Sequence, residues 1–340
     1  MNLENNEISF LNIIYITYNY YIKFKILIYL LLLNVFIFGN FNKFLGKRIN
    51  KISLVIPTIS RDFHKIYNNL RFYINYIDGI KNIILIGNEQ INKLIREKKP
   101  SLSFPIIFIN EKLLIDVNKV QQLIKKKNKY AVRRSGWYIQ QFLKMIYCRL
   151  CHNKFYLVWD SDTIPIKEVK MFSNDRKPIF DVKTEYHKPY FITLKKIFPE
   201  LGKRYNYSFI SEHMIINTNL MKNMIRRITF NKNLIGNTWY EKIINCIEIK
   251  DLPKSGFSEF ETYGTFVKKY YKQIYNIRHW ESLRLRKKIT ELHFNSNFLT
   301  DNDIKNFSKN YNAISFEKNA SNTKLIISNN FFSEKNNFKI

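Results

Sequence analysis

The stretch that decides the fold is Lys154-Phe-Tyr-Leu-Val-Trp-Asp160-Ser161-Asp162-Thr163, in which an apolar, aromatic run ends in two aspartates. Strand side chains alternate between faces, so Asp160 and Asp162 are expected on one side if strand geometry continues through them. Ligands of open α/β sheets bind at the carboxyl ends of strands, where two carboxylates form an oxygen site for Mn²⁺ or Mg²⁺. We therefore predict a metal site here. The alternative is a strand-end turn in which Asp caps the next element.

The chain around this stretch alternates between two kinds of pattern. Short apolar runs predict further strands at 52–57, 82–87 and 105–109. Helical spacing predicts helices at 62–76, 117–127 and 136–150, with a strand followed by a helix within 209–227 and another helix at 262–275. This alternation predicts an α/β fold with a mostly parallel sheet flanked by helices.

Both ends of the chain differ from this central part. Residues 10–38 are very apolar, but Lys23 and Lys25 divide them into runs shorter than the roughly 20 residues that span a bilayer. We expect an interfacial helix that contacts the membrane peripherally, which would place the protein in the cytoplasm at the inner face of the cell membrane. A helix packed on the domain, or an upstream extension of the reading frame, is the alternative.

The predicted organisation therefore has three parts. An apolar extension covers residues 1–49, and a globular domain covers 50–294. A tail rich in Asn, Ser and Lys covers 295–340, and its composition builds a core poorly, so we expect it to be loosely ordered.

The charge of the chain is strongly positive but carries little specific information. Its 340 residues include 56 Lys and Arg against 27 Asp and Glu, a net charge of +29. Such a surplus favours phosphate-bearing partners. The basic residues are mainly Lys and spread along a chain that is also rich in Ile and Asn, so we attribute them to a compositional bias. Because no nucleic-acid-binding signature is present, we expect no nucleic-acid partner.

The three cysteines do not form a complete metal or redox motif. Cys148 and Cys151 have zinc spacing beside His152, but no second cysteine pair exists. We expect buried core thiols instead, and the sparse, odd number suits a reducing compartment.

Five blocks of sequence carry a family resemblance. They are Arg134-Ser-Gly-Trp-Tyr-Ile-Gln-Gln-Phe-Leu-Lys144, Val158-Trp-Asp-Ser-Asp-Thr163, Thr184-Glu-Tyr-His-Lys-Pro-Tyr-Phe191 and Ser211-Glu-His-Met214, and later Gly256-Phe-Ser-Glu-Phe-Glu-Thr-Tyr-Gly264. In this order, over roughly Ser53 to Phe294, the chain resembles the DUF6492 family, grouped with nucleotide-diphospho-sugar transferases of the GT-A fold. The resemblance implies a GT-A-like (Rossmann-like) domain that moves a sugar from a nucleotide-diphosphate donor to a cell-surface glycan or lipid-linked acceptor.

Such a reaction needs positive charge beside the departing nucleoside diphosphate, which a divalent ion supplies as Lewis acid and template. Asp162 is the first choice as a direct ligand of Mn²⁺ or Mg²⁺. The resemblance implies that Asp160 either reaches the ion through water or binds the ribose. It also implies a third ligand from the carboxyl end of the domain, for which His279 and His293 are candidates.

Several residues are candidates for contact with the nucleotide. Thr58 ends the first strand, and Asp62 soon after is expected to accept from base or ribose; its alternative role is a helix cap. Arg134 and Lys144, together with Arg133, are candidates for phosphate contact. The alternative for each cation is a solvated surface position. Gln140 and Gln141 are candidates for sugar contact, or amphipathic-helix surface.

An acceptor hydroxyl needs a general base if the reaction inverts configuration. The candidates are Glu259, which we favour, Glu261 and Glu212. On a strand, the alternating Glu259 and Glu261 would face the same way. The candidates for acceptor binding are Glu185, His187, Tyr190 and His213. His213 has the alternative role of a partly buried histidine whose hydrogen bonds are satisfied.

Two rival functions fit parts of the sequence. A non-catalytic basic protein that binds membrane or nucleic acid would show salt-sensitive binding indifferent to Asp160 and Asp162. Nucleotidyl transfer on a related sheet would require a glycine-rich phosphate loop near the first strand, and residues 57–62 contain no glycine. The clustering of acidic, aromatic and Gln-containing blocks favours sugar transfer.

Overall fold

The computed structural model describes residues 25, 51–98, 104–285 and 301–316. The chain divides into two compact units, residues 1–50 and 51–340. In the first unit only Lys25 is described, as an exposed helical residue. The remaining residues of the apolar segment 10–38, and with them its predicted contact with a membrane, lie outside the described residues. Within the described part of the chain, no helix is long and apolar enough to cross a membrane.

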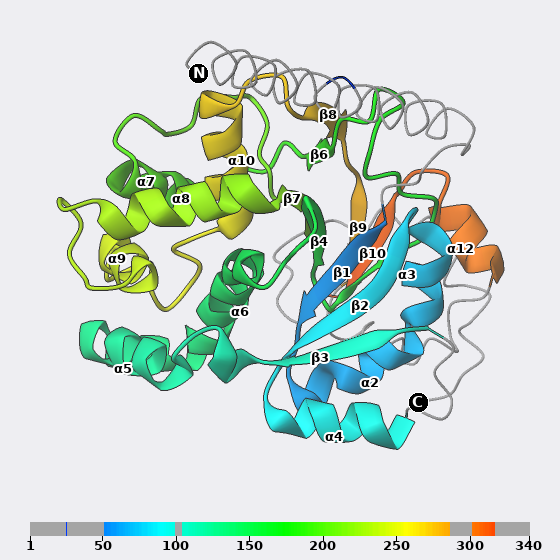
Figure 1. The fold of residues 1–340 in the computed structure, drawn as a ribbon, viewed down its shortest axis with the longest axis horizontal. Helices are drawn as coiled ribbons and strands as arrows, with labels where there is room; N and C mark the ends of the chain where they lie inside the picture. Colours follow the sequence, from blue (N-terminus) through cyan, green and yellow to red (C-terminus); the bar gives the residue numbers. More distant parts are fainter. Residues whose placement is uncertain (1–24, 26–50, 99–103, 286–300, 317–340) are drawn as a thin grey trace, which may run out of the picture. The chain divides into compact units, whose positions relative to one another are not determined.

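A five-stranded sheet forms the centre of the second unit, in the order β3-β2-β1-β4-β7 (Figure 1). Its strands are β1 (Ile52–Pro57), β2 (Ile80–Gly87), β3 (Ile106–Asn110), β4 (Phe155–Trp159) and β7 (His213–Asn217). The first four are parallel, and β7 runs antiparallel to β4. Every residue of β1 is buried, as expected for a parallel strand covered on both faces. The predicted α/β fold with a mostly parallel sheet is confirmed.

Helices alternate with these strands and continue after them. They are α2 (Ser60–Asn68), α3 (Leu70–Tyr76), α4 (Glu89–Lys98), α5 (Val117–Lys127), α6 (Ser135–Ile146), α7 (Lys188–Ile197), α8 (Thr218–Phe230), α9 (Trp239–Cys246) and α10 (Glu259–Tyr270), with 3-10 turns η2 (Glu111–Leu113), η3 (Lys129–Arg134) and η4 (Tyr147–Arg149). The helix predicted at 62–76 is divided into two at Asn69. The helix predicted at 262–275 begins earlier, because the Ser258 side chain caps it by accepting from the amide of Glu261 at 3.2 Å.

Two smaller sheets lie outside the central one. One has the order β5 (Thr163–Pro165), β10 (Ala313–Phe316), β9 (Ser282–Leu285), and the other pairs β6 (Ile179–Val182) with β8 (Asn276–His279). Strand β10 follows helix α12 (Asp301–Phe307) and is buried along its whole length. The expectation of a loosely ordered tail after residue 294 is therefore wrong for residues 301–316, since an apolar strand within this polar segment completes a sheet.

Strand β4 ends at Trp159, and the two aspartates lie on the turn that follows. The amide of Thr163 donates to the carbonyl of Asp160 at 3.1 Å, which closes the turn. Strand geometry therefore does not continue through Asp162, so the condition under which both aspartates were expected on one side is not met. Two buried side chains fix this turn. Tyr73 and Trp159 both donate hydrogen bonds to the carbonyl of Thr163, at 3.1 and 2.8 Å.

The three cysteines are free and buried, as predicted for core thiols. Burial raises the pKa of the Cys148 thiol to about 12, so this group stays protonated and unreactive at neutral pH.

Candidate active site

Asp160 and Asp162 are half-buried at the carboxyl end of β4. Their carboxylates act on the same buried phenol: burial, and after it the negative charges of Asp162 and Asp160, raise the pKa of Tyr73 far above its ordinary value. The structure thus keeps both aspartates at this end of β4, on a turn in place of the expected strand.

The donor set of this turn fits a hard divalent ion that a substrate helps to bind. Among the residues that the structure describes, no group of three or more His, Cys, Asp or Glu side chains is arranged to hold a metal. Mg²⁺ is usually held by one or two carboxylates together with substrate phosphates and water, and two half-buried carboxylates match that need. The exposed His279 contacts Glu281 at 2.5 Å and joins no such group, so its expected role as third ligand is not supported. His293 lies outside the described residues.

Lys144 of α6 binds two carboxylates at once. Its ammonium contacts Asp160 and donates to Glu259 at 2.7 Å, and only 7% of its side chain is exposed. It also lies over the ring of Phe260, 4.4 Å from the centroid. Burial alone would lower the pKa of Lys144, but the two carboxylates raise it well above the ordinary value. Lys144 was predicted to contact phosphate; its charge is instead already balanced by Asp160 and Glu259.

Glu259 and Glu261 lie on the first turn of a helix, not on a strand. Residues two apart on a helix point about 200° apart, so the expectation that both face the same way is wrong. Glu259 turns to Lys144, and its amide donates to Gln141 Oε1 at 3.1 Å. Glu261 accepts from the amide of Phe209 at 3.0 Å and from the Thr265 hydroxyl at 3.1 Å. Burial raises the pKa of both carboxyls. The structure thus brings Glu259 to the aspartates and leaves Glu261 inside the core.

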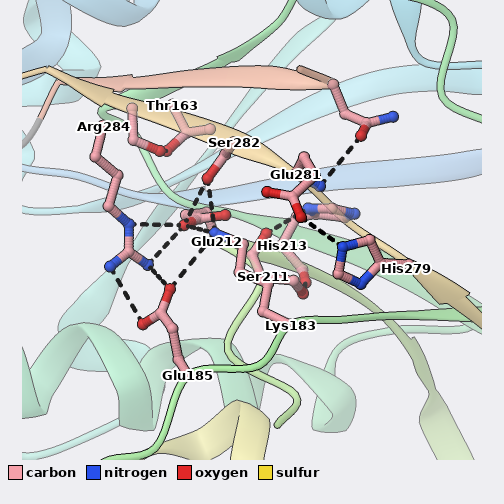
Figure 2. A network of polar contacts seen from close by, with 12 residues as sticks. Thr163, Lys183, Glu185, Ser211, Glu212, His213, His279, Glu281, Ser282 and Arg284 are labelled. Carbon is pink, nitrogen blue, oxygen red and sulfur yellow. Dashed lines mark hydrogen bonds and ion pairs between the residues drawn. The ribbon is translucent and has the colours of Figure 1, made fainter. Parts of the chain in front are cut away.

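Glu212 lies immediately before β7, beside the aspartate turn. The amide of Asp160 donates to the carbonyl of Glu212 at 2.9 Å. The Glu212 Oε1 atom accepts from Lys183, from Arg284 at 2.9 Å and from Ser282 at 3.2 Å. Burial would raise the pKa of Glu212, yet Lys183 and Arg284 hold it below its ordinary value. Figure 2 shows these contacts converging on Glu212 from the strand that carries Arg284 and from the segment that carries Lys183.

Glu185 extends this network toward solvent. It forms an ion pair with Arg284 at 2.6 Å and lies 3.7 Å from Lys183, and 37% of its side chain is exposed. The sequence did not single out Lys183, Ser282 or Arg284. Lys183 directly precedes the block that begins at Thr184, which is a usable signal. Arg284 has no comparable local signal, since only the pairing of β9 with β10 brings it here.

His213, predicted to bind acceptor, is buried and fully occupied. Its Nε2 faces Asp181 at 2.8 Å, and its Nδ1 faces the carbonyl of Ser211 at 2.7 Å. The ring stacks on Trp159 and contacts Trp280 edge-on, with centroids 4.5 and 4.3 Å apart. This geometry favours the alternative role, a histidine that packs in the core.

Asp181 completes this buried group. It also accepts from Arg278 at 2.6 and 2.8 Å. Burial would raise the pKa of Asp181, but the hydrogen bonds from Arg278 and His213 lower it. The ionised carboxylate of Asp181, on β6, therefore connects this strand to His213 of β7 and Arg278 of β8.

Arg134, His187 and Tyr190 meet at the loop that precedes α10. Arg134 donates to the carbonyl of Lys254 at 2.8 Å and to the hydroxyl of Ser255 at 3.0 Å, and His187 contacts the carbonyl of Ser255 at 2.8 Å. Burial and then the charge of Glu259 raise the pKa of Tyr190. This group borders the site. Arg134 was predicted to contact phosphate, and in the structure its guanidinium N–H groups donate to this loop.

Thr58 directly follows the neighbouring strand β1, and Asp62 lies in the first turn of α2. The β1–β4 register pairs Leu54 with Leu157, so the end of β1 comes level with Asp160. Thr58 is buried there, and its amide donates to Ile86 at 2.8 Å. Asp62 forms an ion pair with Lys65 at 2.9 Å within α2 and does not cap it, since α2 has no side-chain cap. The structure places both residues at the predicted edge without showing a contact between them and the aspartates.

Comparison with known families accounts for most of the chain. Residues 49–327 match the family of unknown function DUF6492. The chain belongs to this family. The match extends past residue 294 and takes in α12 and β10, which the resemblance of the sequence blocks left out. No curated protein matches the chain.

Three solved structures show distant similarity to the chain. Mouse xyloside xylosyltransferase 1 has a TM-score of 0.39 at 10% identity, over 78% of this chain and 97% of its own. The bifunctional glycosyltransferase WbbM has a TM-score of 0.40 at 11% identity, over 81% and 47%. The inositol-1-phosphate CTP transferase from T. maritima has a TM-score of 0.34 at 10% identity, over 68% and 86%. At these values the similarities carry no functional argument, which rests on the site itself.

Proposed function

We propose that this protein is a metal-dependent glycosyltransferase that moves a sugar from a nucleotide-diphosphate donor to a glycan or lipid-linked acceptor at the cell surface. The observation that carries the proposal is the pair Asp160 and Asp162, held at the carboxyl end of β4 with Lys144 bridging Asp160 to Glu259. Ligands of open α/β sheets bind at this edge. The resemblance of the sequence blocks to nucleotide-diphospho-sugar transferases supports the same reaction class.

Asp160 and Asp162 are the residues that would hold Mn²⁺ or Mg²⁺. When bound, such an ion would offset the negative charge that develops on the nucleoside diphosphate as it leaves. Asp162 remains the first choice for direct contact with the ion, and Asp160 shares its carboxylate with Lys144.

The other residues of the site hold these carboxylates in place. Lys144 fixes the orientation of Asp160, and Glu259 balances the charge that Lys144 brings into the core. Glu259 is only 2% exposed and engaged with Lys144, so we assign it a positioning role in place of the general base first expected. Arg134, His187 and Tyr190 fix the loop before α10 against α6 and α7, which keeps Glu259 at the helix start.

The proposed location follows from the apolar segment 10–38, whose sequence predicts contact with the inner face of the cell membrane. A lipid-linked acceptor would then be presented beside the enzyme. To test this part of the proposal, the activity of the full chain is measured on vesicles that carry such acceptors. It is compared with the activity on soluble acceptors in the absence of detergent.

Donor consumption tests the reaction itself. The full chain is incubated with UDP-, GDP- and CDP-linked sugars in the presence of Mn²⁺ or Mg²⁺, and release of the nucleoside diphosphate is measured. We expect release from one donor class, lost on chelation and reduced at least about 100-fold in Asp162→Asn. Asp78→Asn, a change at an exposed aspartate, serves as the matched control. Equal release by Asp162→Asn and the wild type would refute the proposal.

A further inference from the structure

The network around Glu212 contains two cations and two carboxylates with an inner and an outer layer. Glu212 and Lys183 form the inner layer, with 6% and 9% of their side chains exposed. Arg284 and Glu185 form the outer layer, with 23% and 37% exposed. Arg284 contacts both carboxylates and so connects the layers. Figure 2 shows Arg284 in contact with both Glu212 and Glu185.

The charges of this network balance each other. Lys183 and Arg284 are matched by Glu185 and Glu212, so the cluster has no surplus positive charge to attract a phosphate. It instead presents alternating donors and acceptors: the N–H groups of Lys183 and Arg284, and the oxygens of both glutamates. Sugar hydroxyls donate and accept at once, so neighbouring hydroxyls of a neutral sugar complement such a set.

Glu212 itself shows two features of a ligand site. Within the described part of the chain, its buried Oε2 atom has no hydrogen-bond partner, although Oε1 accepts from several donors. A buried carboxylate oxygen without a donor is unfavourable, and a substrate hydroxyl would supply the missing hydrogen bond. The backbone of Glu212 is also left-handed, with φ of 60°, a conformation that non-glycine residues adopt rarely.

The network lies directly beside the proposed metal ligands. The amide of Asp160 donates to the carbonyl of Glu212 at 2.9 Å. On the other side, Arg284 pairs with Ser315 of β10, and Ser315 pairs with Thr163, the residue after Asp162. Two independent backbone connections therefore fix the network next to the aspartate turn.

We propose that Glu185, Glu212, Lys183 and Arg284 form a subsite that binds the hydroxyl groups of a neutral sugar beside the Asp160–Asp162 turn. The proposal rests on the proposed function for the identity of the reaction, and adds the substrate group bound here and the residues that bind it. Because Oε2 is buried, neighbouring side chains must move when a sugar hydroxyl reaches it. The sugar belongs to either the donor or the acceptor.

Calorimetric titration in Mn²⁺ identifies a donor sugar. UDP and GDP are compared with UDP-glucose, UDP-galactose, UDP-N-acetylglucosamine and GDP-mannose, on the wild type, Glu185→Gln and Arg284→Gln. Exposed residues of α4 provide the matched controls Glu97→Gln and Arg96→Gln. If the subsite binds donor sugar, both subsite variants lose roughly 10- to 100-fold in affinity for the nucleotide sugar and keep the affinity of the wild type for the nucleoside diphosphate. Glu185 is partly exposed, so this variant folds even if Arg284→Gln does not.

Saturation-transfer NMR tests the subsite without any nucleotide. Free glucose, galactose, mannose and N-acetylglucosamine are added to the wild type and to Glu185→Gln. We expect transfer to one sugar, weakened in Glu185→Gln and unchanged in Glu97→Gln. Transfer that depends on Glu185, with nucleotide-sugar affinity unaffected, assigns the subsite to the acceptor.

The two proposals fail in different ways. Absence of nucleoside diphosphate binding in Mn²⁺ contradicts the proposed function alone. Absence of sugar transfer in the wild type, or equal transfer in Glu185→Gln, together with an unchanged affinity for nucleotide sugars, overturns the subsite.

Discussion

Asp160 and Glu212 are joined through the main chain, because the amide of Asp160 donates to the carbonyl of Glu212 at 2.9 Å. This bond extends the antiparallel pairing of β4 with β7 by one residue beyond the pair Trp159 and His213. The acidic turn and the charged network around Glu212 are therefore parts of one rigid edge of the sheet. A change at either residue is therefore expected to affect the other, as would not be expected of two unrelated carboxylates on the surface.

Removing the charge of Glu212 is expected to destabilise the protein in a pH-dependent way. Lys183 and Arg284 hold its folded-state pKa below the ordinary value of about 4.3. The unfolded chain therefore binds the proton first as the pH falls. The stabilisation by Glu212 is fully present above about pH 4.3 and is lost as the pH falls through the folded-state pKa. The Tm of Glu212→Gln should lie below that of the wild type at pH 7, and the difference should shrink toward pH 3.

Thermal unfolding of both proteins from pH 3 to pH 7 checks this prediction. Glu97→Gln, at an exposed position of α4, controls for the loss of a carboxylate as such. A Tm difference that stays constant over the whole range would show that the ionised state of Glu212 does not stabilise the fold.

Lys144→Met is expected to lower the free energy of unfolding by about 3–5 kcal/mol. The substitution leaves Glu259 buried with an uncompensated charge, and breaking a buried pair on one side has this cost. Urea unfolding measures the change. The double variant Lys144→Met, Glu259→Gln should recover much of the loss, because the charge that remains without a partner is that of Asp160, whose side chain is 34% exposed to water. An additive loss in the double variant would show that the two side chains act independently.

Glu261→Ala should reduce stability without affecting the site. The change removes the acceptor of the Phe209 amide and of the Thr265 hydroxyl, both buried, at a cost of about 1–3 kcal/mol each. Affinity for a nucleoside diphosphate, measured on the folded variant, should equal that of the wild type. A loss of affinity comparable to that in Asp162→Asn would return Glu261 to the list of residues that contact substrate.

Much of the fold was predictable because its strands and helices carry strong local patterns. Apart from Ser53, the run from Ile52 to Pro57 is apolar on both faces, which is typical of a parallel strand covered on both sides. The segment Val117–Lys127 is a helix with the predicted bounds, since Asp116 caps its start by accepting from Lys119 at 2.9 Å. Strand β10 was missed, because four residues in an Asn- and Lys-rich segment give too short a signal and its partners lie far away in sequence.

The parts of the candidate site that lie within a local sequence block were predictable. The parts that depend on the pairing of distant segments were not. The turn with Asp160 and Asp162, and the helix that carries Lys144, were found from their blocks. The ion pair between Lys144 and Glu259 was not, because the block of Glu259 suggested a strand. Arg284 could not be found at all, since its position depends on the register of β9 against β10.

The central claim is that Asp160 and Asp162 form the site of a metal–nucleotide complex, and calorimetry tests it most directly. UDP, GDP and CDP are titrated into the full chain with Mn²⁺ and with chelator, and the titrations are repeated with Asp162→Asn and with Asp78→Asn. We predict binding of one nucleoside diphosphate that requires Mn²⁺, persists in Asp78→Asn and falls at least about 100-fold in Asp162→Asn. Binding that is equal in Asp162→Asn, or that is unaffected by removal of Mn²⁺, would contradict the account.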